Sequence, residues 1–142
     1  MTLMIIRGLP GSGKTTLAKQ MLDRHEYGFG PFEADQYFEK GGEYNFNKCK
    51  LKKAHNWCYD KVRETFAYLI DNAKVVEKEP NSALVIVSNT SSMIWEFQPY
   101  LDLAKNYNHE ISIVTCEGYY GSLHNVPLEA ISRMRDRWEP YS

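Results

Sequence analysis

Residues 8–15 read Gly8-Leu9-Pro10-Gly11-Ser12-Gly13-Lys14-Thr15, and this stretch decides the fold of the chain. It satisfies the phosphate-loop pattern G-x-x-x-x-G-K-[ST] at every required position. The apolar run at residues 3–6 precedes it and predicts a buried strand. Apolar residues at 17, 18, 21 and 22 follow it at helical spacing. A strand, a glycine loop and a helix in this order are the context in which the pattern binds phosphate.

Each residue type in this loop suits phosphate binding. Glycines let backbone N–H groups turn inward, and the helix N-terminus adds partial positive charge. The pattern predicts that Lys14 reaches the β- and γ-phosphates and that the Thr15 hydroxyl holds Mg²⁺. The expected nucleotide-binding residues are Gly8, Pro10, Gly11, Ser12, Gly13, Lys14, Thr15 and Thr16. A glycine turn that binds nothing would not explain why loop, lysine and hydroxyl coincide, so we expect a nucleoside triphosphate, ATP or GTP, as ligand.

The composition is that of an ordinary soluble domain. The chain has 142 residues, a net charge of -1 and 25% charged residues. No apolar run approaches the roughly 20 residues that span a bilayer, and no secretory leader precedes the first strand. Cys49, Cys58 and Cys116 lack metal or disulfide spacing, which is typical of a reducing cytosol. We therefore expect a single cytoplasmic domain over residues 1–142, with no membrane partner.

Strands and helices alternate along the sequence. The expected strands are residues 3–6, 32–34, 83–88 and 111–115. The expected helices are residues 13–25, 50–78 and 93–106, the last interrupted at Pro99, and a helix opening at Pro127. Breaks or turns are expected at residues 28–31, 41–47 and 79–82. This alternation predicts a parallel sheet covered by helices on both faces, with its ligand at the carboxyl ends of the strands.

Polar residues follow the predicted strands at that edge. Asp35, after the second strand, is the best candidate to align and deprotonate an acceptor hydroxyl, although aspartate is also a common helix cap. Asn89, after the third strand, either orients the γ-phosphate or the attacking oxygen, or caps the next helix. Ser88 stands where a metal-binding carboxylate is usual. A second acidic contact to Mg²⁺ would then come from Asp35 through water.

The motifs extend into a likeness to a known family. Residues 7–18 resemble the opening of the polynucleotide-kinase-like ATP-binding family, AAA-type P-loop proteins that include the phage 5′-hydroxyl polynucleotide kinases. Ala34-Asp35-Gln36-Tyr37-Phe38 is similar to the family's [ST]-x-D-[DQ]-Y segment. Further matching stretches are residues 42–47, 54–57, 85–90, 95–100, 124–127 and 133–139. The resemblance implies a three-layer α/β fold with a mostly parallel sheet of four or five strands in the order 2-3-1-4.

The resemblance also implies an activity. Family members transfer the γ-phosphate of ATP, with Mg²⁺, to a hydroxyl, and the acceptor expected here is a polynucleotide 5′-hydroxyl or a nucleoside-like compound. The family's general base falls on Asp35, and Lys14 would stabilise the developing charge. Gly121 and Ser122 stand where the family lid carries an arginine and an asparagine. Arg137 is therefore the candidate phosphate-contacting arginine, whereas Arg133 and Arg135 are expected on a solvated flank.

Departures from the family pattern leave two other functions open. The shortened lid is compatible with a catalytically weak, ATP-dependent binding module, and a nucleotide kinase is a further option. Phe38 stands where some phage enzymes carry a substrate-binding arginine. A basic and aromatic group either begins a solvated helix or receives a nucleic-acid end; its members are Lys48, Lys50, Lys52, Lys53, Tyr44, Phe46 and Trp57. The sequence gives no indication of oligomeric state.

Overall fold

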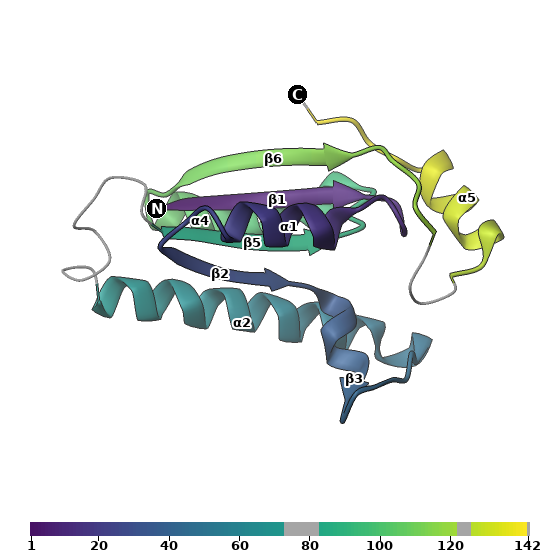
Figure 1. Cartoon of the computed structure of the whole chain (residues 1–142), viewed down its shortest axis with the longest axis horizontal. Helices are drawn as coiled ribbons and strands as arrows, with labels where there is room; N and C mark the ends of the chain where they lie inside the picture. The colour runs from purple at the N-terminus through teal and green to yellow at the C-terminus, as the bar shows by residue number, and fades with distance from the viewer. Residues whose placement is uncertain (73–82, 122–125, 142) are drawn as a thin grey trace.

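The main sheet of the protein has four strands, all parallel. The computed structural model describes residues 1–72, 83–121 and 126–141. The strands are β1 (Thr2–Gly8), β2 (Tyr27–Phe32), β5 (Ala83–Asn89) and β6 (Glu110–Cys116). They lie in the order β2-β5-β1-β6 (Figure 1). Counted along the chain among these four strands alone, this is the expected order 2-3-1-4. The labels differ because a separate hairpin intervenes.

The remaining elements surround this sheet. The hairpin consists of β3 (Glu39–Lys40) and β4 (Glu43–Tyr44), at the turn expected from residues 41–47. The helices are α1 (Lys14–Leu22), α2 (Leu51–Asp71), α4 (Gln98–Asn106) and α5 (Leu128–Asp136). The short 3-10 turns are η1 (Ala34–Phe38), η2 (Lys48–Lys50) and η3 (Ile94–Glu96). In Figure 1, α5 lies beyond the carboxyl ends of β1 and β6.

Side chains on the two faces of the sheet build two separate cores. Leu3, Ile5 and Val85 point to one face and pack with buried residues of α2 and α4. Met4 and Ile86 point to the other face and pack against α1. Because both faces are covered, β1 and β5 are continuous apolar runs. The three-layer α/β fold expected from the sequence is therefore confirmed.

One expected break is instead part of a strand. Residues 28–31 lie within β2, although glycine and proline are poor strand formers. Because β2 is the edge strand, Pro31 does not interrupt a ladder on its outer side. The register with β5 shifts between Phe29 and Phe32, so the strand bulges there. Gly30 has a φ of 117°, and a Cβ at that position would lie 2.6 Å from the carbonyl oxygen of Ile86. Glycine is therefore required at the bulge.

The helices follow the expected pattern with corrections to their bounds. α1 ends at Leu22 and not at residue 25. The helical spacing over residues 50–78 predicts one stripe of Leu51, Ala54, His55, Cys58, Val62, Phe66 and Ile70. In α2, Leu51 and Ile70 are exposed whereas Leu69 is buried, so that stripe was wrong at both ends. A strict four-residue spacing drifts around a helix of 3.6 residues per turn and leaves the buried face. Pro99 lies in the first turn of α4, which restarts the helix as expected. The expected continuation of α2 over residues 73–78 and the turn at 79–82 lie outside the described residues.

A buried arginine holds the C-terminal segment against the end of β1. Arg7 is 1% exposed. Its Nε donates to the carbonyl oxygen of Ser91 at 2.9 Å, and its Nη2 donates to those of Ser92 at 3.3 Å and Glu139 at 2.7 Å. The backbone N–H of Glu139 in turn donates to Ser92 O at 2.7 Å. The chain after β5 and the chain after α5 are thus joined by one side chain at the base of the phosphate loop.

Aromatic rings complete the site of this guanidinium. Its central carbon lies 4.6 Å from the ring centroid of Phe97 and 4.3 Å from that of Trp138. Such cation–π contacts become stronger when the cation is removed from water. Burial lowers the pKa of Arg7, and the charges of Glu139 and Glu96 oppose this shift. We call Arg7 and its partners Ser91, Ser92, Phe97, Trp138 and Glu139 the arginine clamp.

In the ranges that the structure describes, no helix is long and apolar enough to cross a membrane.

Replacing Arg7 should destabilise the protein strongly. In Arg7→Ala, three carbonyl acceptors lose a charged donor and two rings lose their cation, so we expect a loss of about 3 kcal/mol in the free energy of unfolding. Arg7→Lys should lie between the wild type and Arg7→Ala, because an ammonium lacks the planar fork. Urea unfolding measures both. Arg24→Ala, at an exposed position, is the control, and equal midpoints for the two alanine variants would contradict the role of the clamp.

Candidate functional site

The phosphate loop joins β1 to α1 in a left-handed turn. Gly11 and Gly13 have φ values of 80° and 90°, a region that costs other residues roughly 1 kcal/mol. Gly13 stands at the N-cap position of α1. The first turn of α1, with its backbone N–H groups, therefore begins directly after the glycine turn. An anion site requires this arrangement.

Lys14 folds back over this loop. Its Nζ donates to the carbonyl oxygens of Gly8 at 2.9 Å and Leu9 at 3.1 Å. Burial lowers the pKa of Lys14, and the nearby charges of Glu33, Cys116 and Asp35 oppose that shift. The ammonium group is thus held within the loop and within electrostatic reach of two carboxyl groups.

Glu33 is the site residue that the sequence analysis missed. The Thr15 hydroxyl donates to Glu33 Oε1 at 2.8 Å, which joins the phosphate loop to the carboxyl end of β2. Burial raises the pKa of Glu33; the hydrogen bond from Thr15 and the charge of Lys14 act in the opposite direction. A signal was present, since Glu33 lies in the second expected strand, at residues 32–34, and precedes Asp35 by two residues. Only the fold shows that it faces Thr15.

Asp35 lies in η1, directly after β2. Its Oδ1 accepts a hydrogen bond from Tyr44 Oη at 3.2 Å, so the hairpin orients this carboxylate. Burial raises the pKa of Tyr44, with a further contribution from the Asp35 charge. The alternative of a capping aspartate does not apply here, because Glu33 occupies the N-cap position of η1.

Asn89 fastens β5 to the segment that carries Asp35. Its Oδ1 accepts from the backbone N–H of Ala34 at 2.9 Å, and its Nδ2 lies 3.9 Å from Cys58 Sγ. The alternative that Asn89 caps the following helix was wrong, since Met93 stands at the N-cap position of η3. The structure places Asn89 beside η1, where it positions the residues around Asp35.

Two buried hydroxyls, one in the loop and one near the end of β5, have no protein partner in the part of the chain that the structure describes. Among the described residues, Ser12 Oγ and Ser88 Oγ are buried side-chain atoms with no hydrogen-bond partner. Ser88 shares its strand face with Leu84 and Ile86, which pack toward α1. A Cβ on Gly8 would collide with Ser12 Oγ, so the glycine makes room for this hydroxyl. Unpaired buried donors are rare, and these two suit a ligand rich in oxygen acceptors.

The arginine chosen from the sequence makes a hydrogen bond to another side chain. Arg137 Nε donates to Ser92 Oγ at 2.8 Å, beside the arginine clamp. The segment after α5 carries it there, because Trp138 and Glu139 are held by Arg7. Arg133 and Arg135 are exposed on α5, as expected. The structure therefore groups Lys14, Thr15 and Asp35, and it adds Glu33. Arg137 is held by Ser92 instead. Thr16 is exposed and Pro10 is half-buried in the loop.

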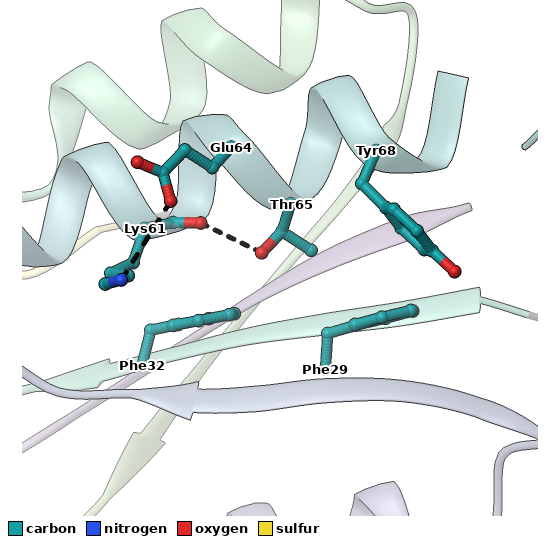
Figure 2. Close-up of a pocket in the computed structure, with 6 residues that line it drawn as sticks. All are labelled: Phe29, Phe32, Lys61, Glu64, Thr65 and Tyr68. Carbon is teal, nitrogen blue, oxygen red and sulfur yellow. Dashed lines mark hydrogen bonds and ion pairs between the residues drawn. The ribbon is translucent and has the colours of Figure 1, made fainter. Parts of the chain in front are cut away.

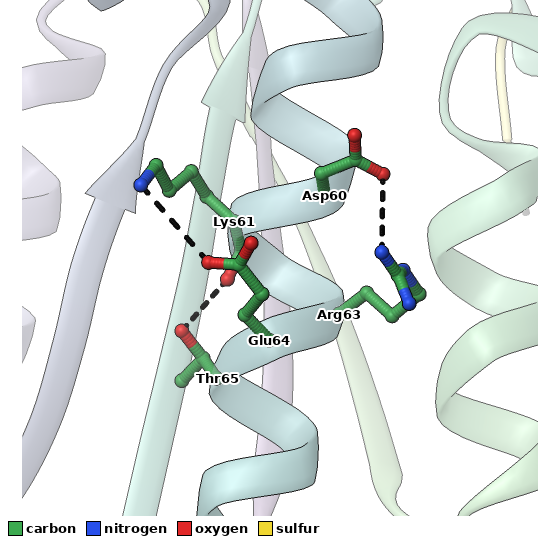
Figure 3. Close-up of polar contacts among 5 residues, drawn as sticks. All are labelled: Asp60, Lys61, Arg63, Glu64 and Thr65. Carbon is green, nitrogen blue, oxygen red and sulfur yellow. Dashed lines mark hydrogen bonds and ion pairs between the residues drawn. The ribbon is translucent and has the colours of Figure 1, made fainter.

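A groove of about 320 Å³ lies away from this group, between β2 and α2 (Figure 2). Its lining residues are Phe29, Phe32, Lys61, Glu64, Thr65 and Tyr68. α2 also carries two exposed ion pairs, Lys61–Glu64 at 4.0 Å, beside the groove, and Arg63–Asp60 at 3.6 Å (Figure 3). Exposed pairs of this kind contribute at most about 1 kcal/mol. These residues supply control positions for the site variants.

The family of the chain follows from comparison with known proteins. A family model described as an AAA domain matches residues 3–119, and the chain belongs to this family. The chain is 26% identical over 150 residues to NEDD4-binding protein 2 of Homo sapiens, covering 99% of this chain and 8% of that protein. It is 22% identical over 138 residues to an uncharacterized protein of Pasteurella multocida (strain Pm70), covering 94% and 74%. The chain thus spans less than a tenth of the human relative.

Solved structures show the same fold at low identity. A chain of the Pnkp1/Rnl/Hen1 complex superposes with a TM-score of 0.55 at 19% identity, over 93% of this chain and 38% of that one. The APS kinase CysC of Mycobacterium tuberculosis gives 0.52 at 14%, over 96% and 95%. A gluconokinase from Sinorhizobium meliloti 1021 gives 0.54 at 12%, over 98% and 75%. The chain therefore has a kinase-like P-loop fold, and the family resemblance expected from the motifs is confirmed.

Glu33→Gln should stabilise the protein most at neutral and alkaline pH. Because burial raises the pKa of Glu33, its neutral form is favoured in the fold, and stability is lost as the pH rises through that pKa. Glutamine keeps the acceptor for Thr15 and does not ionise. We expect a higher unfolding temperature than the wild type at pH 8, and a gain that shrinks toward pH ~4. Thermal melts measure it, with exposed Glu64→Gln as control; a gain that grows in acid would contradict the assignment.

Proposed function

We propose that this chain is an ATP-dependent kinase that transfers the γ-phosphate to an acceptor hydroxyl, a polynucleotide 5′-hydroxyl or that of a nucleoside-like compound. The hydrogen bond between Thr15 and Glu33 carries the proposal. It joins the phosphate loop to residues 33–35, and this brings the charge of Asp35 into interaction with Lys14. A loop for phosphates beside a carboxylate is the minimum that phosphoryl transfer requires. Membership of the AAA-domain family supports the proposal.

The loop residues bind and neutralise the polyphosphate. The glycine turn at residues 8–13 presents backbone N–H groups, and Lys14 exchanges the carbonyls of Gly8 and Leu9 for phosphate oxygens. Thr15 and Glu33 are the groups that would hold Mg²⁺, since both offer oxygen atoms within 2.8 Å of each other. When bound, Mg²⁺ would neutralise charge on the phosphate oxygens. The hydroxyls of Ser12 and Ser88 are further donors to this region.

Asp35 acts on the acceptor. Its carboxylate, oriented by Tyr44, accepts the proton of the attacking hydroxyl. The acceptor oxygen forms the new bond to the γ-phosphorus as the bond from that phosphorus to the bridging oxygen breaks. The bridging oxygen leaves with ADP. Asn89 keeps the segment in place through the N–H of Ala34.

Aromatic and basic residues beside Asp35 favour a nucleic-acid end as acceptor. The rings of Tyr37 and Trp57 lie 6.0 Å apart, and Phe46 is 54% exposed against Phe38. η2 and the start of α2 add the exposed lysines Lys48, Lys50, Lys52 and Lys53. Exposed rings stack bases, and ammonium groups bind the phosphates that follow them.

A second function, an ATP-dependent binding module, is favoured by the position of Arg137. Its Nε is engaged by Ser92, so the phosphate-contacting arginine expected from the family has another partner. Such a module would bind ATP without hydrolysing it. Its affinity for a macromolecular partner would depend on whether nucleotide is bound. Pull-downs with and without ATP test it, and identical recovery of the same partners under both conditions would argue against it. A nucleotide kinase is distinguished by its acceptor in the transfer assay.

Transfer of labelled γ-phosphate tests the main proposal. The acceptor panel contains 5′-hydroxyl oligonucleotides, nucleosides and nucleotides, with Lys14→Ala as the blank. We expect transfer by the wild type and a decrease of about 10²-fold or more in Asp35→Asn, because the variant cannot accept the proton. ATP binding by Asp35→Asn should persist.

Asp60→Asn is the matched control, since Asp60 is exposed on α2 and pairs only with Arg63 among the ion pairs described (Figure 3). It should transfer phosphate at the wild-type rate. Intact ATP binding with no transfer to any acceptor would refute the kinase proposal and leave the binding module.

A further inference from the structure

The segment after β6 crosses the phosphate loop. β6 is the neighbour of β1, and Cys116 lies opposite Gly8 in the sheet. The backbone N–H of Tyr120 donates to the carbonyl oxygen of Gly11 at 2.7 Å. Residues 117–121 are thereby fixed to the loop through the main chain, independently of their side chains.

The ring of Tyr120 rests on the glycine turn. Two of its carbons lie 3.2 and 3.4 Å from the position that a Cβ on Gly13 would occupy. A Cβ on Gly118 would lie 2.6 Å from Cε2 of the same ring, one of these two carbons. Two glycines thus make space for this ring, yet Tyr120 is 81% exposed. A large aromatic side chain is held beside the phosphate site with most of its surface open.

The arrangement of the sheet determines which end of a triphosphate reaches this ring. Asp35 and Asn89 follow β2 and β5, on one side of β1. In the nucleotide binding of the proposed function, the γ-phosphate faces that side, whether or not it is transferred. The nucleoside end of the same triphosphate then extends to the opposite side of β1, toward β6 and residues 117–121.

We propose that Tyr120 stacks against the base of the bound nucleoside triphosphate and forms the base side of the nucleotide site. The inference rests on the nucleotide binding in the proposed function, but not on phosphate transfer. Stacking on an aromatic ring tolerates every base, so Tyr120 adds affinity without selecting ATP over GTP.

Binding measurements with two probes test this assignment. Titration calorimetry compares Mg·ATP with Mg·tripolyphosphate, which carries the phosphates but no base. We expect Tyr120→Ala to weaken ATP binding roughly 10-fold, as the loss of one base–aromatic stack does, and to leave tripolyphosphate binding unchanged. Tyr120→Phe should bind ATP as the wild type does. Tyr119→Ala, at the adjacent exposed position, is the control and should bind both probes normally.

A second variant tests the position of the same ring without changing Tyr120 itself. Gly118→Ala places a methyl group against Tyr120 Cε2 and should displace the ring, so it should weaken ATP binding without affecting tripolyphosphate. Thermal melts verify that each variant is folded.

The possible outcomes are distinct. Unchanged ATP affinity in Tyr120→Ala, or an equal change for both probes, would overturn the inference. Tighter binding of both probes would overturn it too, by showing that the ring obstructs the loop. A wild type that binds ATP but transfers no phosphate would refute the kinase and leave this inference standing. A wild type that binds neither probe would remove both.

Discussion

The organisation of this protein depends on a guanidinium group buried where the central strand ends. Arg7 is the second-last residue of β1, and Gly8, the last, opens the phosphate loop. It binds three carbonyl oxygens from two distant segments and lies between two aromatic rings. Burying an unpaired charge would cost several kcal/mol, so these partners are obligatory and not incidental. The same contacts fix the base from which the loop starts.

At the carboxyl ends of the strands, charges are held in place at some cost to stability. Burial raises the pKa of Glu33 and lowers that of Lys14, so the protein encloses both an acid and a base against their preference for water. Their mutual attraction offsets part of that cost. Groups kept in this state can respond strongly to an incoming polyphosphate and cation, because little solvent must be rearranged. Sites of this kind trade stability for function.

The sequence predicted the fold well where a local signal coincided with a global one. The phosphate loop, the alternation of elements and the apolar runs of β1 and β5 led to the correct layers and strand order. It failed at Gly30 and Pro31, because only an edge strand with a bulge tolerates these residues, and edge position is a property of the whole sheet. It missed Glu33 and misplaced the contacts of Asn89, since both depend on which strand ends meet. Arg137 resembled a phosphate ligand in sequence, but Ser92 engages it in space.

The arginine clamp also has a consequence for the order in which the molecule can be assembled. Arg7 and Glu139 are separated by 132 positions along the chain. During synthesis on the ribosome, the last carbonyl acceptor of Arg7 emerges only after all four strands of the main sheet have been made. Closing so long a segment carries an entropic cost that is offset only when residue 139 is in place. The nascent protein must therefore complete its phosphate-binding end last.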